Sequence, residues 1–342
     1  MTSEPTTLVE STACGRLGVM HLKRYWSKCL LRATGKLPQE VLREEGKIDT
    51  TLIAVVGLGL HQALTHLYHN KPSFDAFEDW LSSLHPEGLN QAKIDEFNAY
   101  ILSRRLKQSP PDPATHVLSE EDMAFWEENG YVIIRQAVSR TDCEAAISAI
   151  CEFIEIDRSE STSWYRPHPS RVGIMVQLFQ HPALEKNRQS AKVRAAYRQL
   201  WNRTDLWLNT DRAGFNPPET SSWKFPGPRL HWDVSLAQPI PFGSQGILYL
   251  ADTEANQGAF TLVPGFQNRV AGWLSDLPPG ADPRDQDLYA LGTRPIVANA
   301  GDFIIWHHAL PHGSSPNTSS LPRFVQYINY EPLDAEVHEE WI

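Results

Sequence analysis

The segment that decides the fold class lies near the C-terminus, at residues 301–313, and reads GDFIIWHHALPHG. Its first half, from Phe303 to Trp306, is a run of apolar and aromatic residues that is typical of a β-strand. Its second half contains three histidines and ends on a Pro-His-Gly sequence that favours a turn. A strand that leads directly into a histidine-rich turn indicates a β-sheet domain with a functional site at one strand end.

Short strand-like runs recur from about residue 206 to residue 330, and Pro, Gly and Asn separate them. We expect strands at residues 246–250, 259–263, 294–297, 303–306 and 324–330. Regular spacing of short strands with turn residues between them is typical of a double-sheet β-barrel or jelly roll. The predicted fold class is therefore mainly β, with helices before the sheet.

Helical patterns precede the strands. Residues 17–105 contain apolar residues at three-to-four spacing and are interpreted as a helical region. A proline-rich linker at residues 108–113 then separates two domains, residues 1–110 and residues 111–342. After the linker we expect a helix that Ser119 caps and Gly130 ends, a strand at 131–134 and a second helix from Thr141 to Phe153.

Bulk properties exclude several classes of protein. The chain has 342 residues and a formal charge of -10, which leaves no basic face for nucleic acid. Its four cysteines lack the spacing of a zinc site and are too few to crosslink a chain of this length. The longest apolar stretch, residues 52–60, is about half of what a bilayer requires, and the N-terminus lacks the pattern of a signal peptide. We expect a cytoplasmic protein that acts without a membrane.

The first candidate metal ligands are His231 and Asp233, which are two residues apart. In an extended chain, such residues point to the same side, so both can bind one ion. A third ligand comes from His307, His308 or His312, and His312 is favoured because only it precedes Gly-Ser and lies eleven residues before Arg323. Two histidines and one carboxylate are the ligands of non-haem Fe(II), and they leave one face of the ion open.

Arg323 is the candidate anchor for a co-substrate. A hairpin return of the chain after His312 would bring Arg323 back toward the metal. A guanidinium there can bind the distal carboxylate of 2-oxoglutarate through two parallel hydrogen bonds. Ser314 or Thr318 would add a hydroxyl group.

The segments around these residues resemble the phytanoyl-CoA dioxygenase family of Fe(II)/2-oxoglutarate oxygenases. The resemblance is carried by His231-x-Asp233, by GAFTLVPG at residues 258–265, by HGSxxN at residues 312–317 together with Arg323, and by FWEENGYVII at residues 125–134. It covers about residues 116–335 and excludes residues 1–110. It implies a double-stranded β-helix, or cupin-like jelly roll, with His231, Asp233 and His312 as metal ligands. It also implies Arg323 and Ser314 as the residues that bind 2-oxoglutarate.

The expected reaction is hydroxylation of a small-molecule metabolite by Fe(II), 2-oxoglutarate and O2, with release of succinate and CO2. Side chains expected to contact the substrate are Gln177, Asn209, Arg212 and Trp232. Two alternatives stay open: an iron oxygenase that does not use 2-oxoglutarate, and a non-catalytic barrel that serves as a sensor or scaffold. The N-terminal helices would either pack on the barrel or bind a second copy of the chain or a carrier protein.

Overall fold

The computed structural model describes residues 7–105, 108–338 and 340–342. Its contacts divide the chain into two compact units. Unit 1 comprises Met1–Ser109, Arg203–Asp211 and Glu331–Asp334, whereas unit 2 comprises Pro110–Asn202, Arg212–Tyr330 and Ala335–Ile342. Unit 1 therefore includes two short segments that are distant in sequence from the N-terminal helices.

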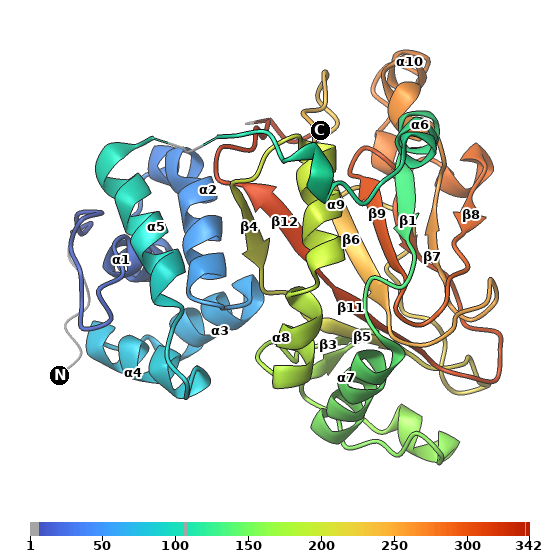
Figure 1. The fold of residues 1–342 in the computed structure, drawn as a ribbon, viewed down its shortest axis with the longest axis horizontal. Coiled ribbons are helices and arrows are strands. Elements are labelled where there is room, and N and C mark those ends of the chain that lie inside the picture. The colour runs from blue at the N-terminus through green and yellow to red at the C-terminus, as the bar shows by residue number, and fades with distance from the viewer. Residues whose placement is uncertain (1–6, 106–107, 339) are drawn as a thin grey trace. The chain divides into compact units, whose positions relative to one another are not determined.

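Unit 1 is a helical assembly around its own apolar core (Figure 1). Its helices are α1 (Leu22–Ala33), α2 (Gln39–Val55), α3 (Leu60–Asn70), α4 (Phe74–Leu84) and α5 (Gln91–Ser103). Phe77 and Phe97 are fully buried in this core, and the distant Leu333 packs with them while Trp207 covers the edge. The strand β4 (Leu206–Asn209), which also belongs to this unit, pairs with β12 (Asn329–Pro332) in a two-stranded sheet. The predicted helical region is confirmed.

The entry to unit 2 follows the sequence prediction closely. The Ser119 side chain accepts a hydrogen bond from the Asp122 N–H and caps α6 (Glu120–Asn129). Gly130 ends this helix with a positive φ of 73°, a conformation that glycine adopts without strain. The strand β1 (Tyr131–Ile134) follows at once, and α7 (Arg140–Phe153) starts one residue before the predicted Thr141, because Ser139 is its cap.

Two antiparallel sheets form the body of unit 2. The larger sheet has the strand order β1-β9-β6-β11-β5-β3-β2, and the smaller has the order β10-β7-β8. Their further members are β2 (Arg171–Val172), β3 (Met175–Val176), β5 (Ala213–Asn216), β6 (Ser244–Tyr249), β7 (Phe260–Leu262), β8 (Arg294–Pro295), β9 (Phe303–His307), β10 (His312–Ser314) and β11 (Arg323–Tyr327). All five predicted strands are present, although β8 is shorter than expected and residues 324–330 divide between β11 and β12.

The core of unit 2 lies between the two sheets. Ile304 and Trp306 of the large sheet pack with Phe260 and Leu262 of the small one, and all four side chains are buried. Side chains on a strand alternate between its two faces. The next residue along β9, Ile305, therefore faces away from this core. Two sheets that enclose one core make the predicted jelly roll, a double-stranded β-helix.

Helices cover the outer face of the large sheet (Figure 1). They include α7, α8 (Pro182–Arg188) and α9 (Ala191–Trp201). The Tyr197 ring of α9 lies 6.1 Å from that of Phe303, and Asn187 of α8 donates a 3.0 Å hydrogen bond to Gln326. The remaining short helices are η1 (Pro113–Thr115), η2 (Ser161–Tyr165), η3 (Phe266–Asn268), α10 (Val270–Ser275), η4 (Pro283–Asp285) and η5 (Leu288–Leu291). One face of the large sheet is thus covered, and the other is left for the interior of the barrel.

Within the described ranges, no single helix is long and apolar enough to cross a membrane. Two helical segments, residues 44–55 and 60–70, are long and apolar enough only when taken together. The chain bends by 99° between them.

A buried lysine joins helices α1 and α2 in unit 1. Lys28 is 1% exposed, and its Nζ lies 2.7 Å from Glu45 Oε2 and 2.5 Å from Asp49 Oδ1. The Nε2 atom of His21 lies 2.9 Å from the same Asp49 oxygen. Although His21, Glu45 and Asp49 are close enough to hold a metal ion, the ammonium group of Lys28 already contacts both carboxylates. The cluster is therefore an internal ion-pair network.

Replacement of Lys28 by Met should destabilise unit 1 by about 3 kcal/mol at neutral pH, because it leaves partly buried carboxylates without their cation. Burial raises the pKa of Glu45, but hydrogen bonds from Arg24 and Lys28 outweigh it and lower that pKa from 4.5 to about 2. A lowered carboxyl pKa stabilises the fold above the unfolded value and loses this effect as the pH falls. In urea denaturation followed by circular dichroism, the difference between wild type and variant should shrink between pH 4.5 and pH 2.

Lys47→Met is the control in the same unit. Lys47 pairs with Glu331 at 2.8 Å, but both side chains are about a quarter exposed, so its loss should cost less than about 1 kcal/mol. Equal costs for the two variants, or a Lys28→Met cost that does not change with pH, would contradict the role assigned to the network.

Candidate metal centre

The centre is assembled by backbone pairing between two segments far apart in sequence. His312 is the first residue of β10, and it forms an isolated antiparallel bridge with His231. The N–H of each histidine donates to the carbonyl of the other, at 2.9 Å and 3.0 Å. Because β10 is also paired to β7, the bridge fixes the His231 segment to the edge of the small sheet. The two imidazoles are thereby placed side by side.

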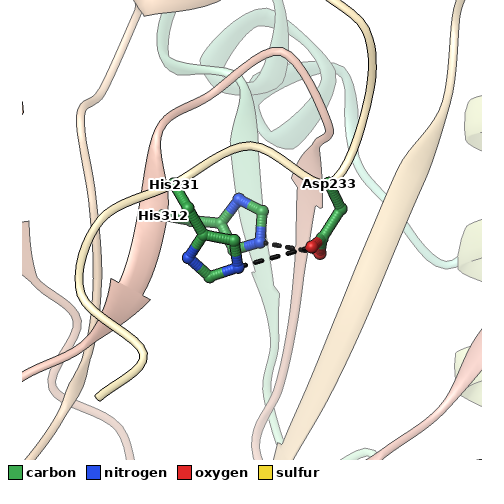
Figure 2. A group of neighbouring side chains, drawn as sticks. All are labelled: His231, Asp233 and His312. Atoms are coloured by element: carbon green, nitrogen blue, oxygen red, sulfur yellow. Dashed lines mark ion pairs between the residues drawn. The ribbon is translucent and has the colours of Figure 1, made fainter. Parts of the chain in front are cut away.

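Asp233 completes a compact group of three side chains (Figure 2). Its Oδ1 lies 3.4 Å from His231 Nε2, and its Oδ2 lies 3.3 Å from His312 Nε2. The Nδ1 atoms of the two histidines face backbone carbonyls, those of Arg229 at 2.7 Å and Leu310 at 3.0 Å. An Nδ1–H held by a carbonyl leaves the Nε2 lone pair of each ring free to bind a cation.

The donor set fits a first-row transition metal. The candidate ligand atoms of the three residues lie within 4.8 Å of one another. Two atoms that each lie about 2.1 Å from an ion, at right angles to one another, are about 3 Å apart. The observed separations of 3.3 and 3.4 Å between nitrogen and oxygen atoms are close to this value. Two imidazoles and one carboxylate in this arrangement match the facial triad of non-haem Fe(II) sites.

The electrostatics of the group favour a bound cation. Burial alone would raise the pKa of Asp233, but its contacts with His231 and His312 lower that pKa well below its ordinary value. Burial lowers the pKa of His231, but the hydrogen bonds to Asp233 and to the Arg229 carbonyl, together with the charge of Asp233, outweigh it and raise that pKa. Asp233 is therefore an anion at neutral pH, and it offers a bound cation the negative charge of the group.

Several residues that hold this geometry were not predicted from sequence. Arg284 donates to the carbonyls of Trp232 and Val234, at 2.9 Å and 2.7 Å, and so fixes the backbone on both sides of Asp233. Gln245 of β6 donates a 2.7 Å hydrogen bond from its amide nitrogen to Asp233 Oδ2. Neither residue belongs to a recognisable motif, because only the folded chain brings them to this loop.

Arg323 and Ser314 lie together inside the same barrel. Arg323 is 0% exposed, and its Nη2 donates a 3.0 Å hydrogen bond to Ser314 Oγ. Its Nε and Nη1 atoms find no hydrogen-bond partner among residues 7–105, 108–338 and 340–342. A buried guanidinium with two unused donors is costly unless an anion supplies the missing contacts. This arrangement can bind a carboxylate.

His307 and His308, the alternatives to His312, lie outside the group of three ligands. The Nδ1 of His307 accepts a 3.0 Å hydrogen bond from the Ala309 N–H, and burial lowers the pKa of His307 to about 3. The Nε2 of His308 contacts the carbonyl of Pro241 at 2.5 Å. Both rings thus have contacts with backbone atoms away from Asp233.

The other residues named from sequence have varied surroundings. Trp232 is 2% exposed, and its Nε1 donates to the Ala309 carbonyl while its ring packs on Phe266 and Trp273. Gln177 directly follows β3 and is half-buried. Arg212 accepts a backbone hydrogen bond from Tyr327.

Asn209 belongs to unit 1, where its amide donates to Glu331 at 2.9 Å. Thr318 is exposed and contacts Asn256. The assignment of Gln177, Asn209, Arg212 and Trp232 to substrate binding stays a prediction.

A jelly roll that brings two histidines and a carboxylate together at the edge of its small sheet defines the class of non-haem metalloenzymes. Within this class, the family model of phytanoyl-CoA dioxygenase (PhyH) matches residues 126–325, which is more than half of the chain. The chain therefore belongs to the phytanoyl-CoA dioxygenase family, as the sequence motifs predicted. The expected enzyme class, a non-haem Fe(II)/2-oxoglutarate-dependent dioxygenase, is confirmed with the family.

Individual relatives are distant. A Dictyostelium discoideum protein named "Putative phytanoyl-CoA dioxygenase" is 23% identical over 260 residues, which cover 61% of this chain and 74% of that protein. Among solved structures, the non-haem alpha-ketoglutarate-dependent carbocyclase SnoK from nogalamycin biosynthesis is 19% identical with a TM-score of 0.45, over 67% of this chain and 89% of SnoK. EctD from S. alaskensis with bound Fe is 17% identical with a TM-score of 0.47, over 68% of this chain and 86% of EctD. Similarity at this level indicates no substrate.

Gly313, between His312 and Ser314, is expected to be essential to the centre although it ligates nothing. A Cβ at this position would lie 2.5 Å from the carbonyl oxygen of Arg229 and 2.8 Å from its carbon. Gly313→Ala should push the His231 segment away from β10 and weaken Co(II) binding about 10- to 100-fold, as measured by isothermal titration calorimetry. Gly272→Ala is the control, because nothing lies within 4 Å of its added Cβ. Equal Co(II) affinity in both variants would refute this role.

Proposed function

We propose that the chain hydroxylates a small-molecule substrate, with Fe(II) bound by His231, Asp233 and His312 and with 2-oxoglutarate bound by Arg323 and Ser314. One observation carries the proposal. A three-residue donor set suited to iron includes His312 of β10, and Ser314 of the same strand contacts a buried guanidinium that has two donors without a partner among the described residues. A dicarboxylic keto acid is the ligand that both features together suit, because it offers one end to a metal and a carboxylate to the arginine.

When bound, Fe(II) with 2-oxoglutarate and O2 supplies the oxidation of a substrate C–H bond, while the keto acid becomes succinate and CO2. The protein contributes position and charge. Asp233 supplies the negative charge, and the carbonyls of Arg229 and Leu310 set the orientation of the two rings. Arg284 keeps the Asp233 loop in place through two backbone carbonyls.

Arg323 and Ser314 select the co-substrate. The 3.0 Å hydrogen bond from Nη2 to Ser314 Oγ holds one end of the guanidinium, and Nε and Nη1 each keep a donor that a carboxylate oxygen would meet. Bidentate binding of a carboxylate by arginine is directional, so it fixes where the other end of a keto acid lies. The anion also offsets the burial of the arginine, which favours binding over the empty site.

The two alternatives do not explain why Arg323 is buried with unpaired donors among the described residues. An iron oxygenase without 2-oxoglutarate and a barrel that serves as a sensor or scaffold both lack the anion that would compensate this buried charge. An iron oxygenase without 2-oxoglutarate requires activity that does not depend on a keto acid. A sensor or scaffold requires stability that does not depend on one.

We further propose that the protein works in the cytoplasm. Its cysteines, Cys14, Cys29, Cys143 and Cys151, are free thiols in the structure, which suits a reducing compartment. Docking of a second copy of the chain or of a carrier protein by the N-terminal helices stays a prediction.

The direct test of the function is succinate formation by iron-loaded protein across pools of small metabolites. We expect succinate to form with a subset of pools, and an absorption band from the iron and 2-oxoglutarate to arise under anaerobic conditions. Asp233→Ala should abolish both signals, whereas the control Asp252→Ala, which changes an exposed carboxylate paired with Arg140, should retain both. Absence of the band and of succinate in wild-type protein would contradict the proposal.

Arg323→Met separates a ligand-binding arginine from a structural one. Loss of a buried charge–charge contact should weaken 2-oxoglutarate binding by about thirtyfold, or about 2 kcal/mol. The free protein should be at least as stable as wild type in thermal denaturation, since an uncompensated buried charge has been removed. If the variant were destabilised and its 2-oxoglutarate affinity unchanged, Arg323 would be a structural residue.

A further inference from the structure

Two buried polar atoms beside the metal centre have no hydrogen-bond partner among the residues that the structure describes. They are the amide oxygen Oε1 of Gln245 and the indole nitrogen Nε1 of Trp306. Trp306 is only 3% exposed, so water does not readily reach its ring. Buried polar groups in native proteins nearly always have a partner, and an exception calls for an explanation.

These two side chains are neighbours on the inner face of the large sheet. Gln245 of β6 and Trp306 of β9 are directly opposite one another in the antiparallel register. Residues in such a pair project from the same face of the sheet, with Cβ atoms about 5 Å apart. The Trp306 ring centroid lies 5.1 Å from that of His312, and the Gln245 amide reaches Asp233. The two unpaired atoms, Gln245 Oε1 and Trp306 Nε1, therefore belong to side chains that contact the proposed metal ligands.

The orientation of the Gln245 amide is fixed by charge. Its nitrogen donates a 2.7 Å hydrogen bond to Asp233 Oδ2. A flipped amide would place an oxygen against the carboxylate, with two acceptors in contact. Gln245 Oε1 is therefore held as a free acceptor, and Trp306 Nε1 can only donate.

We propose that Gln245 and Trp306 form a recognition pair for one polar group of the substrate, a hydroxyl or a primary amide. Such a group accepts a hydrogen bond from Trp306 and donates one to Gln245. The inference deepens the proposed function and rests on it, because it names the substrate class of the same site. Gln245 is in addition a positioning residue, since the same amide that meets the substrate orients Asp233.

The co-substrate does not meet these requirements. The keto and carboxylate oxygens of 2-oxoglutarate only accept hydrogen bonds, so none of them can satisfy Gln245 Oε1. A hydrocarbon chain would leave both atoms unpaired. A site built to hydrogen-bond a polar group strongly rejects analogues that lack it. The pair thus selects alcohols and amides over ketones, ethers and unsubstituted alkyl chains.

Nuclear magnetic resonance of the Trp306 indole N–H tests this claim without turnover. The full chain, labelled with ¹⁵N at its tryptophan indoles and loaded with Zn(II) and 2-oxoglutarate, is titrated with 1-butanol, butanamide and 2-butanone. Trp306→Phe identifies the relevant signal. We expect that signal to shift saturably with the alcohol and the amide. The affinity for the ketone, which forms one hydrogen bond fewer, should be about fivefold lower.

Two variants separate the roles of the pair. Gln245→Met should remove the preference for alcohol over ketone and weaken Co(II) binding about tenfold, because Asp233 loses its amide donor. Trp306→Phe should weaken binding of all three probes but leave the affinities for Co(II) and 2-oxoglutarate unchanged. Trp201→Phe is the matched control, since its Nε1 already has a partner, Ser244 Oγ at 3.1 Å. It should behave like wild type in every measurement.

Each contrary result has a distinct meaning. A Trp306 signal that shifts with 2-oxoglutarate alone and not with the alcohol or amide would assign the indole to the co-substrate and overturn the proposal. Equal affinity for butanamide and 2-butanone would overturn it as well. So would the absence of any shift with 1-butanol and butanamide. Failure of the proposed function would instead appear as the absence of 2-oxoglutarate binding to wild-type protein. The titration uses wild-type protein, so its result does not depend on how well the Gln245 variant folds.

Discussion

The reciprocal backbone hydrogen bonds between His231 and His312 are the constraint on which the site depends. They join a loop to the edge of the small sheet, and they place two imidazoles beside one carboxylate. Two further features make this close approach possible. Gly313 has no side chain to collide with Arg229, and Arg284 holds the loop at the carbonyls on both sides of Asp233. The jelly roll supplies rigid strands, and a few contacts convert its edge into a metal centre.

The interior of the barrel keeps polar groups that a purely structural core would not contain. Among the residues that the structure describes, the fully buried Arg323 has two donors without a partner, and Gln245 and Trp306 each have one unpaired atom. These groups destabilise the free protein, since burial without a partner is unfavourable. They become favourable when ligands supply the missing contacts. The unpaired atoms therefore describe the chemistry of the expected ligands: a carboxylate at Arg323, and a group that both donates and accepts at Gln245 and Trp306.

Sequence alone predicted the parts of the molecule that depend on local patterns. The strand β9 and the capped helix α6 were recognisable from an apolar run and from Ser119 and Gly130. The pairing of residues 228–231 with β10 has no local signature, because it depends on a contact between segments about 80 residues apart. For the same reason, Gln245 and Arg284 could not be identified, since only the register of β6 and the course of a loop bring them to Asp233. The sequence predicts that the β-rich region begins at about residue 206, and residues 206–209 do form the strand β4, but this strand belongs to unit 1 with the N-terminal helices.

The central claim is that one ferrous ion is bound by His231, Asp233 and His312. Anomalous X-ray diffraction at the iron edge, on crystals of the full chain grown anaerobically with Fe(II), tests it directly. The account predicts one strong anomalous peak within about 2.2 Å of the two Nε2 atoms and an Asp233 oxygen. A peak at the cluster of His21, Glu45 and Asp49 with none at His231, or no peak at all in iron-loaded crystals, would contradict it.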